Sequence, residues 1–207
     1  MAAVRLDGRR HGAAGRLNCR PVIAQSDRWP IRHLCGVGIH ALKMEEVLAI
    51  VEAAIAARRR LLIGVVNAAK IVNMRRDVSL RRAVLSSDMI LVDGMAVVWA
   101  SRLLGQAVPE RVAGIDLMLR MLELADQRGY RVYCLGAREE VLSHTIARIG
   151  HDYPGVRLAG WRDGYFTEQQ EAAVVADIRR SGSDILLVGI SSPKKERFLA
   201  RWSEELG

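Results

Sequence analysis

Leu91-Val92-Asp93-Gly94-Met95 joins an apolar strand directly to a helical segment and leaves one carboxylate at the junction. Residues 89–92 form a short, continuous apolar run, which is typical of a strand buried in a parallel sheet. Gly94 permits a sharp turn after that strand. Ligand sites of open α/β sheets lie at such strand ends, so Asp93 is a candidate functional group. The segment alone leaves a second role open, in which Asp93 caps the following helix.

Apolar strands and amphipathic helices alternate on both sides of this segment. Strands are predicted at residues 34–39, 61–66, 89–92, 131–135, 156–159 and 184–188. Helices are predicted at residues 43–58, 68–75, 78–85, 95–104, 116–128, 139–149 and 168–180, and a last helix from Pro193 to the C-terminus. The first two strands and the helix between them suggest a βαβ unit. The alternation predicts an α/β fold, Rossmann-like, with a mostly parallel sheet of about six strands and helices on both faces.

The composition indicates one globular domain behind a basic start. The chain has 207 residues, of which 50% are hydrophobic, and this is enough for a sizeable core. The net charge of +8 is uneven, since residues 1–32 hold seven arginines and two aspartates. We expect a flexible basic leader at residues 1–32 and an ordered domain at residues 33–207. Aromatic residues make up only 5% of the chain, so no nucleic-acid partner is expected.

The cysteines and histidines indicate neither a disulfide framework nor a metal site. Three cysteines are widely spaced, and five histidines are scattered without a pair at metal-ligand spacing. This usage fits a reducing cytoplasm. No apolar stretch of the sequence reaches the ~18 residues that span a bilayer, and its start lacks the apolar core of a secretory signal. Any membrane contact is therefore expected to be peripheral.

Two strand-to-helix turns are candidate anion sites. Leu135-Gly136-Ala137 takes a strand through a glycine turn into a helix, the arrangement that brings backbone N–H groups to a phosphate. A single glycine is a weak signature for a dinucleotide, and a plain tight strand-to-helix turn is the alternative that the segment alone favours. In Ser191-Ser192-Pro193-Lys194-Lys195, Ser192 and Pro193 suit a helix start, and the lysines add charge that favours a diphosphate. A capped surface helix with solvated lysines is the alternative.

Arg111 and Asn67 are further candidates for binding. Arg111, in the segment Pro109-Glu110-Arg111, could clamp an anion with two hydrogen bonds. The alternative is that Glu110 and Arg111 form a plain surface turn. Asn67, at the end of the strand over 61–66, could bond a ligand hydroxyl or cap the next helix. The sequence contains no P-loop, H-E-x-x-H or Asp-x-Asp motif. No metal and no other cofactor is expected.

Taken together and in order, these motifs resemble the WecG/TagA/CpsF family of bacterial glycosyltransferases. The resemblance covers roughly residues 34–206. It rests on the collinear segments Val66-Asn67-Ala68-Ala69-Lys70, 88–95, Pro109-Glu110-Arg111 with Gly114 and Asp116-Leu117, Leu135-Gly136, Tyr153-Pro154-Gly155, Gly164-Tyr165-Phe166 and 184–196.

The resemblance implies an inverting, metal-independent transfer of a sugar from a UDP-sugar, such as UDP-N-acetylmannosamine, to a polyprenyl-diphosphate-linked sugar. Such a reaction serves the assembly of a surface polysaccharide or cell-wall polymer, at the cytoplasmic face of the membrane. By the same resemblance, Asp93 matches the proposed catalytic base, and Asn67 and Arg111 match positions of the substrate pocket. The remaining candidates for substrate binding are Gly136, Ser191 and Lys195.

Three departures from the family pattern motivate an alternative. Val65 stands where many members have a threonine, and Lys195 replaces the glutamine of the usual Pro-Lys-Gln-Glu run. A lysine can bind an anion but cannot accept a hydrogen bond as glutamine does. The sequence also stops at Leu206-Gly207, where family members continue into a basic C-terminal appendage, so the appendage is expected to be missing. The alternative is a truncated, catalytically silent nucleotide-sugar-binding protein.

Overall fold

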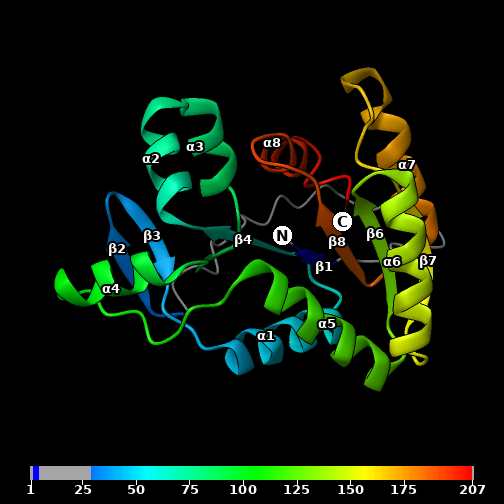
Figure 1. Cartoon of the computed structure of the whole chain (residues 1–207), viewed down its shortest axis with the longest axis horizontal. Coiled ribbons are helices and arrows are strands. Elements are labelled where there is room, and N and C mark those ends of the chain that lie inside the picture. Colours follow the sequence, from blue (N-terminus) through cyan, green and yellow to red (C-terminus); the bar gives the residue numbers. More distant parts are fainter. Residues whose placement is uncertain (1, 5–28, 207) are drawn as a thin grey trace, which may run out of the picture.

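The computed structural model of the chain describes residues 2–4 and 29–206. Its central sheet has six strands in the order β5 (Met89–Val92), β4 (Leu61–Val66), β1 (Ala2–Val4), β8 (Ile185–Gly189), β6 (Arg131–Gly136) and β7 (Arg157–Arg162). The pairs β4–β5, β6–β8 and β6–β7 are parallel, whereas β1 runs antiparallel to both of its neighbours. The predicted α/β fold with a mostly parallel sheet is confirmed (Figure 1). The carboxyl ends of β4, β5, β6 and β8 therefore lie along one edge.

Strand β1 falls within the range for which the sequence predicts a flexible leader. Its three residues pair with β4 on one side and with β8 on the other. At Ala2–Val4 the structure thus differs from the prediction. Backbone hydrogen bonds can hold a strand in a sheet even where its sequence shows no alternation of apolar and polar residues. The rest of the predicted leader up to residue 28 lies outside the described residues.

The single strand predicted at residues 34–39 is wrong. β2 (Ile31–Leu34) and β3 (Val37–His40) form an antiparallel hairpin, which is a separate two-stranded sheet. Cys35 and Gly36 connect the two strands with φ angles of 50° and 75°. Two positive φ angles are characteristic of the type I′ turn that often joins antiparallel strands. Because β3 is not part of the main sheet, the predicted βαβ unit is also wrong. Helix α1 (Met44–Ala56) leads instead from the hairpin to β4.

Helices cover both faces of the sheet, as predicted. Alternate residues of β4, such as Ile63, pack with α1, α5 (Gly114–Arg128) and α6 (Glu139–Asp152). Leu62 faces the other side, toward α7 (Glu171–Ser181) and α8 (Lys194–Arg201). A third core joins the hairpin and β5 to α2 (Ala68–Arg76), α3 (Val78–Leu85) and α4 (Met95–Leu103). Figure 1 shows α1 and α5 on one side of the sheet and α2, α3 and α8 on the other.

Capping groups confirm two predicted helix ends. The Asp77 side chain accepts a hydrogen bond from the Leu80 N–H (2.8 Å) at the start of α3. Gly129 follows α5 in the left-handed conformation (φ 66°), which a glycine adopts without steric cost. None of the helices within the described residues is long and apolar enough to cross a bilayer.

The C-terminal part differs from the prediction in two places. β7 begins at Arg157 and continues to Arg162, beyond the strand predicted at 156–159, since it pairs with β6 along most of its length. Helix α8 has Pro193 as its N-cap and no side-chain cap, so Ser192 does not cap it. It ends at Arg201 and is followed by turns, rather than running to the C-terminus.

His40 ties the hairpin to the main sheet. Its Nδ1 accepts a hydrogen bond from the Ile90 N–H of β5 (3.0 Å), and its ring packs edge-on against Trp29 (5.6 Å between centroids). The side chain is buried, and burial lowers its pKa below the ordinary 6.5 because the imidazolium is poorly solvated there. The neutral ring is therefore the form that the fold accommodates.

We predict that the free energy of unfolding falls as the pH is lowered through about 6.5. The unfolded chain binds a proton to His40 at a higher pH than the folded chain does, so acid favours unfolding by up to about 1.4 kcal/mol per pH unit. His40→Asn keeps an acceptor for the Ile90 N–H and should remove this contribution, whereas His144→Asn, at an exposed position of α6, should not. Urea titrations at several pH values measure the slope, and equal slopes for wild type and His40→Asn would contradict the assignment.

Candidate active site

Asp93 lies at the carboxyl edge of the sheet, immediately after β5. Its backbone N–H donates to the Val66 carbonyl at the end of β4 (2.8 Å). Helix α4 takes Gly94 as its N-cap and has no side-chain cap, so Asp93 does not have the capping role that the sequence left open. Its Oδ2 instead accepts a long hydrogen bond from the Gly114 N–H (3.4 Å). The carboxylate is partly exposed and held only weakly, which suits a group that must contact a ligand.

A buried ion pair lies next to this edge. The Lys70 ammonium in α2 donates to Oε1 of Glu196 in α8 (2.8 Å) and to the Val65 carbonyl in β4 (2.9 Å). The Glu196 side chain is 1% exposed, and its second oxygen, Oε2, has no hydrogen-bond partner among the described residues. Burial raises the pKa of Glu196, but the hydrogen bond and charge of Lys70 outweigh burial and leave the pKa below its ordinary value. Glu196 is therefore ionised at neutral pH.

Lys195 belongs to the same group of charges. It is the second residue of α8, and its ammonium is partly buried. Burial and the like charge of Lys70 lower its pKa, while Glu196 and Asp93 act in the opposite direction. The structure thus brings Lys195 into the electrostatic neighbourhood of Asp93. A partly desolvated cation beside a helix N-terminus is well suited to attract an anion.

Asn67 has the capping role that the sequence left open. Its side-chain Oδ1 accepts the Lys70 N–H (2.9 Å) at the start of α2. The residue is also exposed and lies beside the Asp93 turn, since a Cβ on Gly94 would stand 3.7 Å from the Asn67 Cβ. Capping and ligand contact are compatible, because the side-chain amide N–H groups are not used by the cap.

Gly136 and Ser191 lie at the ends of the next two strands along the edge. Gly136 has φ 142°, and a Cβ there would meet the Gly189 carbonyl at 2.4 Å, so only glycine allows β6 and β8 to end this close together. The Ala137 N–H donates to the Gly189 carbonyl (3.2 Å). Ser191 is exposed, and its carbonyl accepts the Lys195 N–H (3.2 Å). The loop carrying Ser191 therefore leads directly into the start of α8.

Arg111 lies at the rim of this edge. The neighbouring Val112 N–H donates to the Val92 carbonyl (2.8 Å), which places the loop beside the end of β5. The guanidinium pairs with Asp116 (2.7 Å) in an exposed position. The neighbouring Glu110 accepts the Met44 N–H (3.1 Å) at the start of α1. An exposed pair is worth little, so Arg111 can exchange Asp116 for an anionic ligand at low cost.

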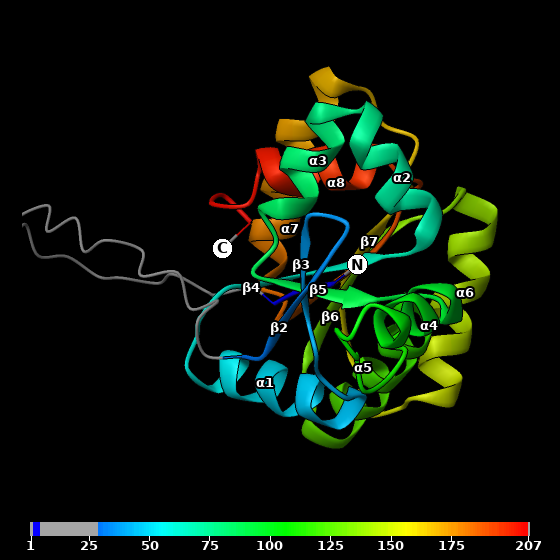
Figure 2. The same ribbon diagram turned by 90° about the vertical axis from the view of Figure 1, so that its left-hand side faces the viewer.

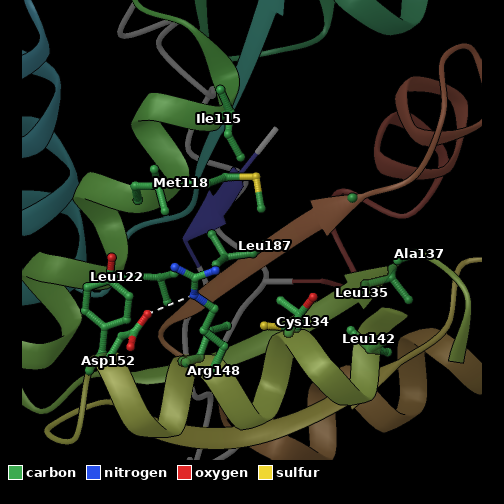
Figure 3. Close-up of a pocket in the computed structure, with 16 residues that line it drawn as sticks. Ile115, Met118, Leu122, Cys134, Leu135, Ala137, Leu142, Arg148, Asp152 and Leu187 are labelled. Atoms are coloured by element: carbon green, nitrogen blue, oxygen red, sulfur yellow. Dashed lines mark hydrogen bonds and ion pairs between the residues drawn. The ribbon is translucent and has the colours of Figure 1, made fainter. Parts of the chain in front are cut away.

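An apolar cavity of about 640 Å³ opens beside the carboxyl edge, between α5 and α6 (Figure 3). Its upper end is formed by Gly136, Ala137 and Gly189. Its walls are mostly apolar side chains from both helices and from β6 and β8, including Ile115, Met118, Leu122, Cys134, Leu142 and Leu187. Burial raises the pKa of the Cys134 thiol to about 12, so this wall carries no thiolate at neutral pH.

The sequence pattern missed the roles of Lys70 and Glu196. Both belong to segments that carried the family resemblance, but neither was among the candidate site residues. The spacing of Asn67 and Lys70, one turn apart after a strand, is the only local signal for Lys70. Among the described residues there is no group of three or more histidine, cysteine, aspartate or glutamate side chains that could hold a metal ion.

Comparison with known proteins agrees with the sequence resemblance. The profile of the Glycosyl transferase WecG/TagA/CpsF family matches residues 32–207. The chain is 43% identical over 122 residues to a protein of Bacillus spizizenii (strain ATCC 23059 / NRRL B-14472 / W23) named N-acetylglucosaminyldiphosphoundecaprenol N-acetyl-beta-D-mannosaminyltransferase; the match covers 58% of this chain and 46% of that protein. A Bacillus subtilis (strain 168) protein of the same name is 33% identical over 114 residues, 55% of this chain and 44% of its own.

These matches span less than half the length of the two relatives. The family profile, in contrast, extends over nearly all of the residues that form the fold and the edge of the sheet described above. The chain belongs to the WecG/TagA/CpsF family of glycosyltransferases.

Proposed function

We propose that the protein is an inverting, metal-independent glycosyltransferase. It moves a hexose or N-acetylhexosamine, such as N-acetylmannosamine, from a UDP-sugar to a polyprenyl-diphosphate-linked sugar, in the assembly of a surface polysaccharide or cell-wall polymer. The observation that carries the proposal concerns the carboxylate of Asp93. This group caps no helix, accepts one long hydrogen bond and acts on the charge of Lys195. The names of the two relatives support the acceptor class and the sugar.

Asp93 acts as the general base in this proposal. Its carboxylate removes the proton of the acceptor hydroxyl while that oxygen forms a bond to the anomeric carbon of the donor. The bond between the anomeric carbon and the diphosphate breaks on the opposite face, and UDP leaves with the electron pair. One displacement of this kind inverts the anomeric centre.

Lys195 and the neighbouring strand ends receive the donor. The ammonium offsets the charge that develops on the leaving diphosphate, which is the task that a divalent cation performs in metal-dependent transferases. Backbone groups at Gly136 and Ser191 border the same space, and the apolar cavity that begins at Gly136 offers walls for a nucleobase. Arg111 and Asn67, next to Asp93, bind the acceptor sugar diphosphate. The reaction takes place in the cytoplasm at the inner face of the membrane.

A silent binding protein is the competing function, and the lysine at position 195 favours it because family members carry a glutamine there. Incubating the chain with a panel of UDP-sugars and polyprenyl-diphosphate-linked N-acetylglucosamine separates the two functions. Product formation supports the transferase. Donor binding by calorimetry without any product supports the silent protein.

We predict that Asp93→Asn slows transfer by about 10²–10⁴-fold. The amide keeps the shape of the side chain but cannot take the acceptor proton. Donor affinity and thermal stability should stay near their wild-type values, because the carboxylate makes only one long hydrogen bond. Single-turnover assays measure the rate, and a variant with wild-type turnover would remove Asp93 from the mechanism.

Treatment with EDTA is expected to leave the rate of transfer unchanged. The proposed site uses Lys195 in place of a cation, and the described residues offer no cluster of ligands for one. The measurement is the initial rate before and after chelation and again after adding Mg²⁺ or Mn²⁺. Loss of activity with EDTA and its recovery with either ion would show the metal-free mechanism to be wrong.

Lys195→Gln, which restores the usual residue of the family, is expected to weaken UDP binding at low ionic strength by about fivefold. This corresponds to about 1 kcal/mol of Coulomb attraction to the diphosphate, and salt should reduce the difference. Arg157→Gln removes the same charge from the start of β7 and serves as the control. Titration calorimetry at two salt concentrations measures both, and equal affinities for wild type and Lys195→Gln would make Lys195 a solvated surface lysine.

A further inference from the structure

Helix α4 exposes a continuous apolar stripe. Met95, Trp99 and Leu103 follow one another at intervals of four residues and are 42%, 63% and 89% exposed, and Leu104 at the end of the helix is 58% exposed. The opposite side of the helix is buried through Val97 and Val98 in the third core. We call these four exposed residues the α4 stripe. The helix therefore presents an aromatic and several aliphatic side chains to its surroundings without a covering element.

The elements that share the third core with α4 are strongly basic. β2, β3, α2, α3 and α4 together contain seven basic residues and no acidic one; we call these five elements the basic lobe. Lys70 is used by Glu196, and Arg81 donates to the Gly36 carbonyl. The other five are exposed and form no ion pair with any carboxylate of the described residues: Arg32, Arg75, Arg76, Arg82 and Arg102.

Helices α1, α5 and α6 carry the opposite net charge, whereas α8 is basic, with four basic residues and one acidic residue. Helices α1, α5 and α6 carry nine acidic residues: Glu45, Glu46, Glu52, Asp116, Glu123, Asp126, Glu139, Glu140 and Asp152. Figure 2 shows that α2, α3, the hairpin and α4 all lie on the side of the molecule that faces the viewer. The exposed apolar helix thus belongs to a positively charged part of the molecule.

We propose that the protein docks on an anionic lipid bilayer through the α4 stripe, with the arginines of the basic lobe around it. A helix with tryptophan and leucine on its exposed side and arginine beside them is suited to the interface of a bilayer, where the apolar side chains enter and the cations meet lipid phosphates. The proposal rests on the proposed function, because a polyprenyl-linked acceptor lies in a membrane.

Charge favours a bilayer over a second copy of the chain. A symmetric dimer would bring the same patch of each protomer together, so the Arg102 side chains of the two copies would lie near one another with no acidic residue of α4 to pair with them. Apolar exposure favours a bilayer over a nucleic acid. Single-stranded nucleic acids are bound by stacking on several aromatic side chains, whereas three of the four residues of the stripe are aliphatic.

Helix α4 also stands where a lipid-linked acceptor would need it. It begins two residues after Asp93, with Gly94 as the turn between them. The surface that enters the bilayer and the carboxylate that receives the acceptor proton are therefore carried by one short segment.

The test is flotation of the full 207-residue chain with vesicles of phosphatidylcholine and phosphatidylglycerol, and with vesicles of phosphatidylcholine alone. We expect binding to the anionic vesicles that weakens with salt and is much lower on phosphatidylcholine alone. Trp99→Ser/Leu103→Ser should reduce the affinity at least about tenfold, and Arg102→Gln about fivefold at low salt. The control, Val141→Ser/Trp161→Ser, removes an aliphatic and a tryptophan side chain that are 55% and 47% exposed on α6 and β7, and it should bind like wild type.

Three results would overturn the proposal. If the control variant loses as much affinity for vesicles as Trp99→Ser/Leu103→Ser does, the loss reflects a general effect of replacing exposed apolar side chains. Failure of the wild type to float, together with self-association that Trp99→Ser/Leu103→Ser abolishes in sedimentation velocity, would assign the stripe to a second copy. Tight binding of a short RNA that competes with vesicles and depends on the stripe would assign it to a nucleic acid.

Transfer to an acceptor with a short, water-soluble prenyl chain separates this proposal from the proposed function. The stripe variants should keep wild-type turnover on that acceptor and lose it only on acceptor embedded in vesicles. Flotation of the wild type without transfer to either acceptor would support the docking surface and remove the glycosyltransferase function. Transfer to both acceptors without flotation would do the reverse.

Discussion

The ion pair between Lys70 and Glu196 determines how the helices meet at the carboxyl edge of the sheet. It joins α2 to α8 across 126 positions of the sequence, and the second hydrogen bond of Lys70, to Val65, anchors the pair to β4. Desolvating two charges costs several kcal/mol for each ion, and this cost is offset only if both remain paired and hydrogen-bonded. Loss of one partner leaves a buried charge without compensation. The position of Lys195, the residue next to Glu196, therefore depends on a contact that no substrate needs to touch.

The parallel sheet supplies the second constraint. Because β4, β5, β6 and β8 run in the same direction, the residues that follow each strand meet at one edge although they come from widely separated parts of the chain. The close approach of Gly136 to Gly189 brings β6 and β8 together there, where a side chain on Gly136 would collide with backbone. A glycine also determines the position of Asp93. Because Gly94 takes the N-cap position of α4, the Asp93 carboxylate caps no helix and stays partly exposed.

The parts of the fold that follow from periodic burial could be predicted from the sequence. The buried strands, most of the helices and the place of Asp93 at a strand end all have such a pattern. Features that depend on partners distant in the sequence could not be predicted. Lys70 and Glu196 come together only when two helices meet, and β1 pairs with β4 and β8, which lie far along the sequence. The Cys35-Gly36 turn lacks the asparagine or aspartate that usually marks a two-residue hairpin, so β2 and β3 read as one strand.

Charge is distributed unevenly over the described residues. In the proposed reaction, a soluble UDP-sugar and a lipid-linked acceptor reach one carboxylate from different surroundings. The basic lobe differs in net charge from the side formed by α1, α5 and α6. Helix α4 has nine residues and is about 14 Å long, so every residue of the α4 stripe stays within about that distance of the turn that carries Asp93. If α4 docks on a bilayer as proposed, it holds Asp93 close to the lipid phosphates. The apolar cavity between α5 and α6 is lined by Gly136 at the end of β6, and three strands of the sheet separate β6 from β5, the strand that leads to Asp93 and α4.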